Sequence, residues 1–256
     1  MGFLTPDDPG YNPEIRQSGF NRYKQCLSFY AANWMKVNLL TIAGALPLAA
    51  VIALSILSSS VLILLPGCFV CGALFGPFLA GLYDAVLRGL RDDPMNWKDA
   101  YQKSWKQNWK ESLLPGGVFG VLLGAYVFMA FLFWQATLPP TPGTLALYAF
   151  AGFLTLLFST LYWPQTVLFQ LTLPNKIRNL LLFAAKYFWR VAGVTLLQAL
   201  YTALYVLFAP WSVILLPFLG FWYIVFLTQF LIYAPLNEEL RIEESLLTLK
   251  SDERLA

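Results

Sequence analysis

Apolar residues along this chain come in six long runs, and nearly all charged residues lie in the segments between them. Each run has about 20 residues, which is the length that a helix needs to cross a hydrocarbon layer of about 30 Å. We therefore predict an all-α membrane bundle of six spanning helices. Their ranges are roughly 37–57, 61–84, 116–135, 145–172, 191–209 and 212–234.

The segments between the runs differ in charge. The links 58–60, 136–144 and 210–211 contain no charged residue, and all 17 Lys and Arg residues lie in the longer segments and towards the chain ends. Cationic residues stay on the cytoplasmic side of a membrane. We therefore expect both termini and the two long loops to be cytoplasmic. Pro164, inside the fourth run, predicts a kink or a break in that helix.

Three segments that precede spans have the periodicity of amphipathic helices. In the second, an aromatic residue recurs at every fourth position with lysines beside it, which is typical of a helix in the headgroup layer. A docking face for a cytosolic partner is the alternative. The residues expected to contact anionic lipid are Trp97, Tyr101, Trp105, Trp109, Lys98, Lys106 and Lys110, with Trp34 and Trp189 at the ends of the other two segments.

These three segments also suggest a threefold repeat of an interfacial helix followed by a transmembrane hairpin. Asn96 and Asn175 are the expected starts of the second and third helices. The alternative is that Trp and cations gather at every interface without duplication. In a single membrane domain, the units would be 14–84, 94–172 and 174–240, with 1–13 and 241–256 as cytoplasmic tails.

Composition narrows the possible functions. Only 12% of the residues are charged and 58% are hydrophobic, whereas an average soluble domain has about 25% charged residues. The chain has no histidine, the commonest general base and metal ligand. No metal-ligand cluster or nucleophile motif appears. We therefore expect no enzyme activity, cofactor or metal, and a net charge of +3 gives no reason to expect a nucleic-acid partner.

Two sets of polar residues in the spans are candidates for function. Asp84 and Arg88, four residues apart, predict an ion pair at the end of the second span; a proton or ion site is the alternative. Amides in later spans either join helices by hydrogen bonds or bind a neutral solute beside aromatic rings. The candidate solute-binding residues are Gln165, Gln170, Gln198, Gln229, Trp163 and Trp222.

Small residues predict where helices pack closely. Gly116, Gly120 and Gly124 recur at a spacing of four, which places them on one helix face. Cys68 and Cys71 have the spacing of a redox pair, but they lie in the middle of an apolar run without a nearby cation to lower a thiol pKa. We interpret them as small packing residues.

The stretch from Gly76 to Leu113 contains Gly76-Pro77, Ala80, Leu82-Tyr83, Leu87-Arg88 and Arg91-Asp92-Asp93, followed by Trp97-Lys98-Asp99-Ala100-Tyr101 and Trp105-Lys106-Gln107-Asn108-Trp109-Lys110. In these residues it resembles the YesL-like family of bacterial integral membrane proteins. The resemblance rests on about 40 residues, and Asp84 departs from the family pattern. The family has no agreed catalytic residues.

The resemblance implies a protein of the bacterial inner membrane, encoded near genes for sugar uptake and polysaccharide use. Our leading hypothesis is a non-enzymatic protein that assists or mediates carbohydrate-linked solute uptake, with a sugar transporter or a neutral solute as its partner. The alternative is a membrane scaffold or lipid-binding protein that acts through the amphipathic helices. A polar cavity lined by several glutamines would favour the first hypothesis, and a closed core the second.

Overall fold

The computed structural model describes residues 17–93, 96–169 and 171–243, and every regular element in these ranges is helical. The elements are α1 (Gly19–Leu57), α2 (Val61–Arg91), α3 (Trp97–Gln135), α4 (Pro142–Leu168), α5 (Leu173–Lys186), α6 (Phe188–Leu207), the 3-10 helix η1 (Trp211–Leu215), α7 (Leu216–Leu219) and α8 (Phe221–Leu240). The predicted all-α class is therefore confirmed for the described residues.

Within these ranges, five helices are long and apolar enough to cross a membrane, namely α1, α2, α3, α4 and α6. A sixth candidate is a bent pair, in which Trp211–Leu219 and Phe221–Leu240 meet at 57°. The six predicted runs therefore correspond to five unbroken helices and one broken helix. Pro164 lies inside α4, which continues past it without a break. The broken helix is instead the sixth candidate, which is interrupted at Gly220.

The first two amphipathic segments are not separate helices. α1 and α3 each contain 39 residues and run without interruption from the amphipathic segment into the apolar run. The third segment is separate, because α5 ends at Lys186 and α6 begins at Phe188. Asn96 caps α3 as predicted, accepting a hydrogen bond from the Lys98 backbone N–H at 3.0 Å. The expectation for Asn175 was wrong, since α5 already begins at Leu173, with proline in its first turn.

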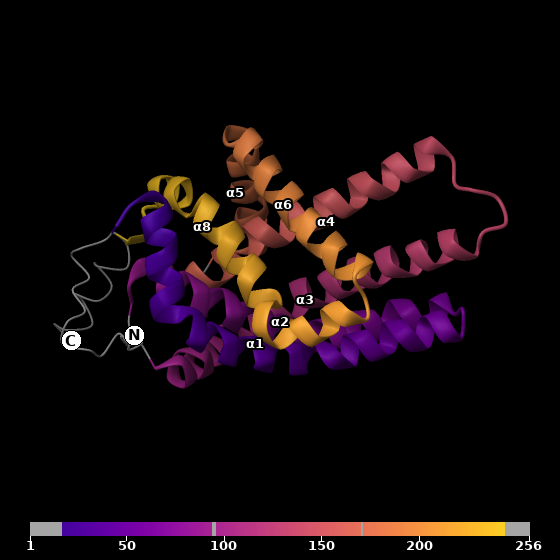
Figure 1. The fold of residues 1–256 in the computed structure, drawn as a ribbon, viewed down its shortest axis with the longest axis horizontal. Helices are drawn as coiled ribbons and strands as arrows, with labels where there is room; N and C mark the ends of the chain where they lie inside the picture. The colour runs from indigo at the N-terminus through magenta and orange to yellow at the C-terminus, as the bar shows by residue number, and fades with distance from the viewer. Residues whose placement is uncertain (1–16, 94–95, 170, 244–256) are drawn as a thin grey trace.

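α2 is the central helix, because it packs against α1, α3, α4 and α8. α1, α2 and α3 run side by side along the long axis of the molecule, and α4 and α6 diverge from them (Figure 1). This arrangement brings the predicted small residues of α3 onto α2, where the two backbones meet directly.

The contact between α2 and α3 is too close for a side chain. A Cβ on Gly116 would lie 2.6 Å from the carbonyl oxygen of Gly72, and one on Gly120 would lie 2.4 Å from that of Cys68. Gly124 faces the Cys68 sulfur, and the Cys68 side chain is fully buried. The prediction that these glycines form a helix-packing face is confirmed.

The break before α8 is held by polar side chains from other helices. Asn38 is fully buried in α1. Its Nδ2 donates to the carbonyl oxygens of Leu216 at 2.8 Å and Pro217 at 3.2 Å, and its Oδ1 accepts from the Trp222 backbone N–H at 3.3 Å. Backbone groups freed by a helix break inside a membrane need such partners, because lipid offers none.

Candidate functional site

Asp84 lies near the end of α2 and is buried, with 5% of its surface exposed. Arg88 Nε lies 2.9 Å from Asp84 Oδ2, and Arg88 Nη1 lies 2.7 Å from Asp93 Oδ2. The buried carboxylate therefore has its counter-ion one turn along the same helix, which offsets much of the cost of burying it. This geometry favours the interpretation of Asp84 as half of an ion pair at a helix end over a proton or ion site.

A second ion pair joins the start of α1 to the end of α2. Arg22 Nη2 donates to Asp92 Oδ2 at 2.7 Å and to the Leu90 carbonyl oxygen at 3.0 Å. Asp92 follows the last residue of α2 and has a left-handed backbone, with φ of 55°. The sequence analysis missed this pair, because no local pattern connects two residues that are 70 positions apart.

Two of the predicted solute-binding residues, Gln198 and Gln229, form hydrogen bonds to another helix. Thr160 Oγ1 donates to Gln198 Oε1 at 2.5 Å, and Gln229 Nε2 donates to the Thr160 carbonyl oxygen at 3.0 Å. These bonds join α4, α6 and α8 in the core. Trp163 and Trp222 are buried, with 1% and 3% of their surfaces exposed. Gln170 lies outside the described residues.

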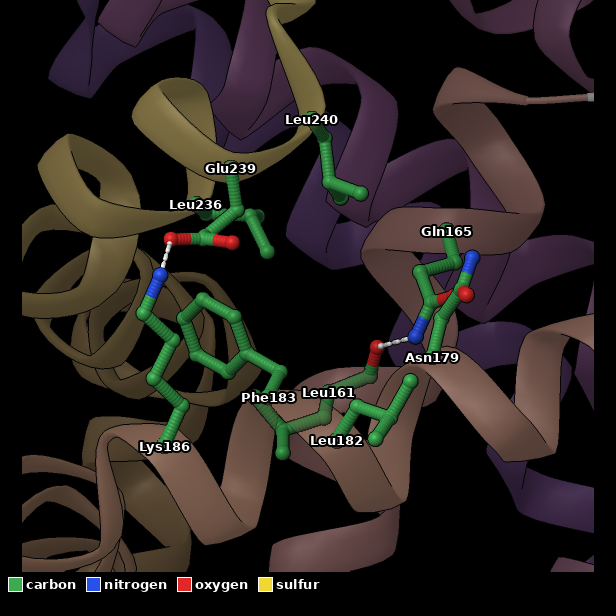
Figure 2. Close-up of a pocket in the computed structure, with 9 residues that line it drawn as sticks. All are labelled: Leu161, Gln165, Asn179, Leu182, Phe183, Lys186, Leu236, Glu239 and Leu240. Atoms are coloured by element: carbon green, nitrogen blue, oxygen red, sulfur yellow. Dashed lines mark hydrogen bonds and ion pairs between the residues drawn. The ribbon is translucent and has the colours of Figure 1, made fainter.

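Gln165 lines a pocket of about 220 Å³ between α4, α5 and α8. Figure 2 shows Gln165 and Asn179 on one side of this pocket and Lys186 and Glu239 on the opposite side, with Phe183 between them. Gln165 is 3% exposed, and its Nε2 donates to the Leu161 carbonyl oxygen at 3.1 Å. Its Oε1 is buried and accepts no hydrogen bond within the described part of the chain.

The far side of the pocket carries balanced charges. Lys186 of α5 forms an ion pair with Glu239 of α8, and the Tyr187 hydroxyl donates to the same carboxylate at 3.0 Å. The hydrogen bond to Glu239 raises the pKa of Lys186 above its ordinary value. The sequence predicts an amphipathic helix for the α5 segment, but only the packing of α5 on α8 brings Lys186 to Glu239.

Much of the predicted lipid-facing surface lies on the first half of α3. Lys98, Lys106 and Lys110 are exposed, and Trp105 and Trp109 each have 40% of their surfaces exposed. We call these five residues the aromatic–lysine surface. Lys110 Nζ lies 5.7 Å from the centre of the Trp109 ring, within the range of a cation–π contact. Large aromatic rings beside flexible cations suit a headgroup layer.

Some aromatic residues predicted at this interface lie elsewhere. Trp34 is 1% exposed, packs on Phe226 with ring centres 4.7 Å apart and donates from Nε1 to the Ala85 carbonyl oxygen at 3.0 Å. Tyr101 is 7% exposed and packs against Gly81. Both expectations are corrected: each residue occurs on a helix face that neighbouring helices cover. The other two predicted rings are accessible, since Trp97 is partly exposed and Trp189 is 85% exposed.

Across the described ranges, no group of three or more cysteine or acidic side chains is placed to hold a metal ion. Comparison of this chain with protein-family models, curated proteins and solved structures found no match. The fold itself defines the class: an all-helical protein whose five or six long apolar helices are compatible with a membrane bundle. Two of its features are candidates for binding, namely the aromatic–lysine surface and the pocket beside Gln165.

Proposed function

We propose that this chain is a non-enzymatic membrane protein that binds anionic lipid and acts as a scaffold through its amphipathic segments. The observation that carries the proposal is the aromatic–lysine surface, where three lysines and two tryptophans are exposed on one segment of α3. A lysine near an anionic membrane surface contributes about 1 kcal/mol. The hydrogen bonds of two predicted solute-binding residues support the same choice, because Gln198 and Gln229 bond to Thr160 and so join helices.

The proposed location is a bacterial inner membrane with both chain ends on the cytoplasmic side. The distribution of cations supports this orientation, because the three short links carry no charged residue. The bacterial assignment rests on the resemblance of the region from Gly76 to Leu113 to the YesL-like family, which is itself part of the proposal. In this orientation the aromatic–lysine surface faces the anionic cytoplasmic headgroups.

The threefold repeat is part of the same proposal. The continuous helices α1 and α3, each followed by a second long helix, support the first two units. The third unit would have the same order of elements as the first two. It differs in two breaks, one at Tyr187 and one at Gly220. Each unit would then place one amphipathic segment at the same membrane face.

Charge reversal on the aromatic–lysine surface tests the lipid-binding function. The variant Lys98→Glu, Lys106→Glu, Lys110→Glu is expected to retain far less anionic phospholipid, because three attractions of about 1 kcal/mol each become repulsions. The measurement is the ratio of phosphatidylglycerol to phosphatidylcholine that remains bound to the purified protein, determined by lipid mass spectrometry. The melting temperature should stay close to that of the wild type, since the three side chains are exposed.

A neutral variant provides the matched control. Replacing the same three lysines by glutamine removes the attraction without adding repulsion, so its lipid ratio should fall between those of the wild type and the charge-reversed protein. Equal ratios in all three proteins would refute the proposed function. A loss of lipid that accompanies a large drop in melting temperature would instead assign the lysines a structural role.

Solute uptake is the second candidate, and the pocket beside Gln165 is the observation that favours it. An amide with a free acceptor next to Phe183 is suited to a hydroxylated solute. We expect proteoliposomes containing the protein to bind or pass an oligosaccharide if this candidate is right, or the protein to co-purify with a sugar transporter. Radiolabelled oligosaccharide retention and affinity purification measure the two outcomes, and a negative result in both would remove the candidate.

A further inference from the structure

The pocket beside Gln165 adjoins an apolar groove. The groove, of about 570 Å³, runs along the outer side of α5 and is lined by Leu173, Pro174, Ile177, Arg178, Leu181 and Leu182. Leu182 lines both spaces and has 59% of its surface exposed. A polar pocket that meets an exposed apolar groove matches a ligand with a polar end and an apolar tail.

The polar end of the ligand must donate a hydrogen bond. Gln165 Oε1 is buried without a partner among the residues that the structure describes, and an unsatisfied buried acceptor is costly until a donor reaches it. The amide is held in place, because its Nε2 already donates to Leu161 of the same helix. A ligand whose polar end carries only methyl groups would leave this acceptor unsatisfied.

The two sides of the pocket match a ligand that carries both signs. Lys186, which is paired with Glu239, provides a cation on one side, and Gln165 lies on the opposite side (Figure 2). A phosphate alone would leave the Gln165 acceptor without a donor, so a free anion is poorly matched. A zwitterion matches both sides, with its phosphate near Lys186 and its ammonium donating to Gln165.

We propose that this pocket binds the headgroup of a phosphatidylethanolamine molecule, with an acyl chain lying in the α5 groove. Ethanolamine carries an ammonium with N–H donors, whereas the trimethylated nitrogen of choline has none. The volume of about 220 Å³ is smaller than that of a pocket for a whole drug-sized ligand, about 300–1,000 Å³. It therefore suits a headgroup and leaves the chains to the groove. The inference rests on the proposed lipid-binding function and adds to it a single site of defined chemistry.

Lipid selectivity of the full-length protein tests the site. Purified protein in detergent is titrated with phosphatidylethanolamine or phosphatidylcholine, and bound lipid is counted by native mass spectrometry. We expect phosphatidylethanolamine to bind about tenfold more tightly, because only its headgroup donates to Gln165. Gln165→Leu should lose this preference, whereas Gln102→Leu, which removes an exposed amide on α3, should keep it.

Each other outcome has a defined meaning. An unchanged preference in Gln165→Leu, or no preference in the wild type, would overturn the site. If Gln165→Leu fails to fold, Gln165→Met, which also removes the acceptor, takes its place: loss of the preference supports the site and its retention overturns it. Glycerophosphoethanolamine, which has the headgroup without chains, should compete at least tenfold more weakly than the lipid; equal competition would mean a soluble ligand and overturn the lipid assignment.

The lysine variants separate this inference from the proposed function. If charge reversal on the aromatic–lysine surface removes anionic lipid while the ethanolamine preference is absent from the wild type, the function stands and the pocket assignment fails. If the preference depends on Gln165 while the lysine variants keep all their anionic lipid, the pocket stands and the scaffold proposal fails.

Discussion

The Gly116→Ala variant is expected to lose about 1–3 kcal/mol of stability, because its added methyl group has nowhere to go. A Cβ at this position would lie 2.6 Å from the Gly72 carbonyl oxygen and 2.8 Å from the Gly76 Cα. Both atoms belong to the backbone of α2, so the two helices have to separate. The measurement is the melting temperature in detergent, with unfolding monitored by circular dichroism.

Gly193→Ala is the matched control. Gly193 lies in α6, and an added Cβ would meet nothing within 4 Å. Alanine is favoured over glycine in a helix by about 1 kcal/mol, so the control should be as stable as the wild type or slightly more so. If Gly116→Ala and Gly193→Ala melt alike, the direct contact of α2 with α3 does not contribute to stability as we infer.

Asn38→Leu is expected to cost about 2–3 kcal/mol, because one buried and two partly buried backbone groups lose their partner, and an unsatisfied buried group costs about 1–3 kcal/mol. These groups are the carbonyl oxygens of Leu216 and Pro217 and the N–H of Trp222. Leucine resembles asparagine in size, so the change tests hydrogen bonding more than volume. Thermal unfolding in detergent measures the loss.

Two further variants define the role of Asn38. Asn38→Asp keeps an acceptor for Trp222 but places an acceptor against two carbonyl oxygens, so it should also be destabilised. Asn33→Ala, at a partly exposed position of the same helix, should change the melting temperature little. An Asn38→Leu protein that melts with the wild type would show that the break is stable without this side chain. The Tyr205 hydroxyl donates to the Leu219 carbonyl oxygen at 3.0 Å. It would then be the next side chain to test for a role in stabilising the break.

The helical class and the approximate places of the apolar helices followed from the sequence, because both depend on local properties. A run of about 20 apolar residues has to satisfy its backbone within one helix if it is to enter lipid. The cap at Asn96 and the glycine face of α3 are also local, since each is read from neighbours within one or two turns. The predicted functional site was less well placed. Of its glutamines, Gln165 lines the pocket, whereas Gln198 and Gln229 join helices in the core.

Hydropathy and charge in the sequence by themselves determined that this chain forms helices with long apolar stretches and that its cations lie between those stretches. The tertiary structure alone decided which faces of those helices are covered. It buried Trp34 and Tyr101, left Trp105 and Trp109 partly exposed, and placed Lys186 of α5 beside Glu239 of α8. The reason is physical: periodicity shows that a helix has two faces, but only its packing against distant helices determines which face meets protein and which meets lipid.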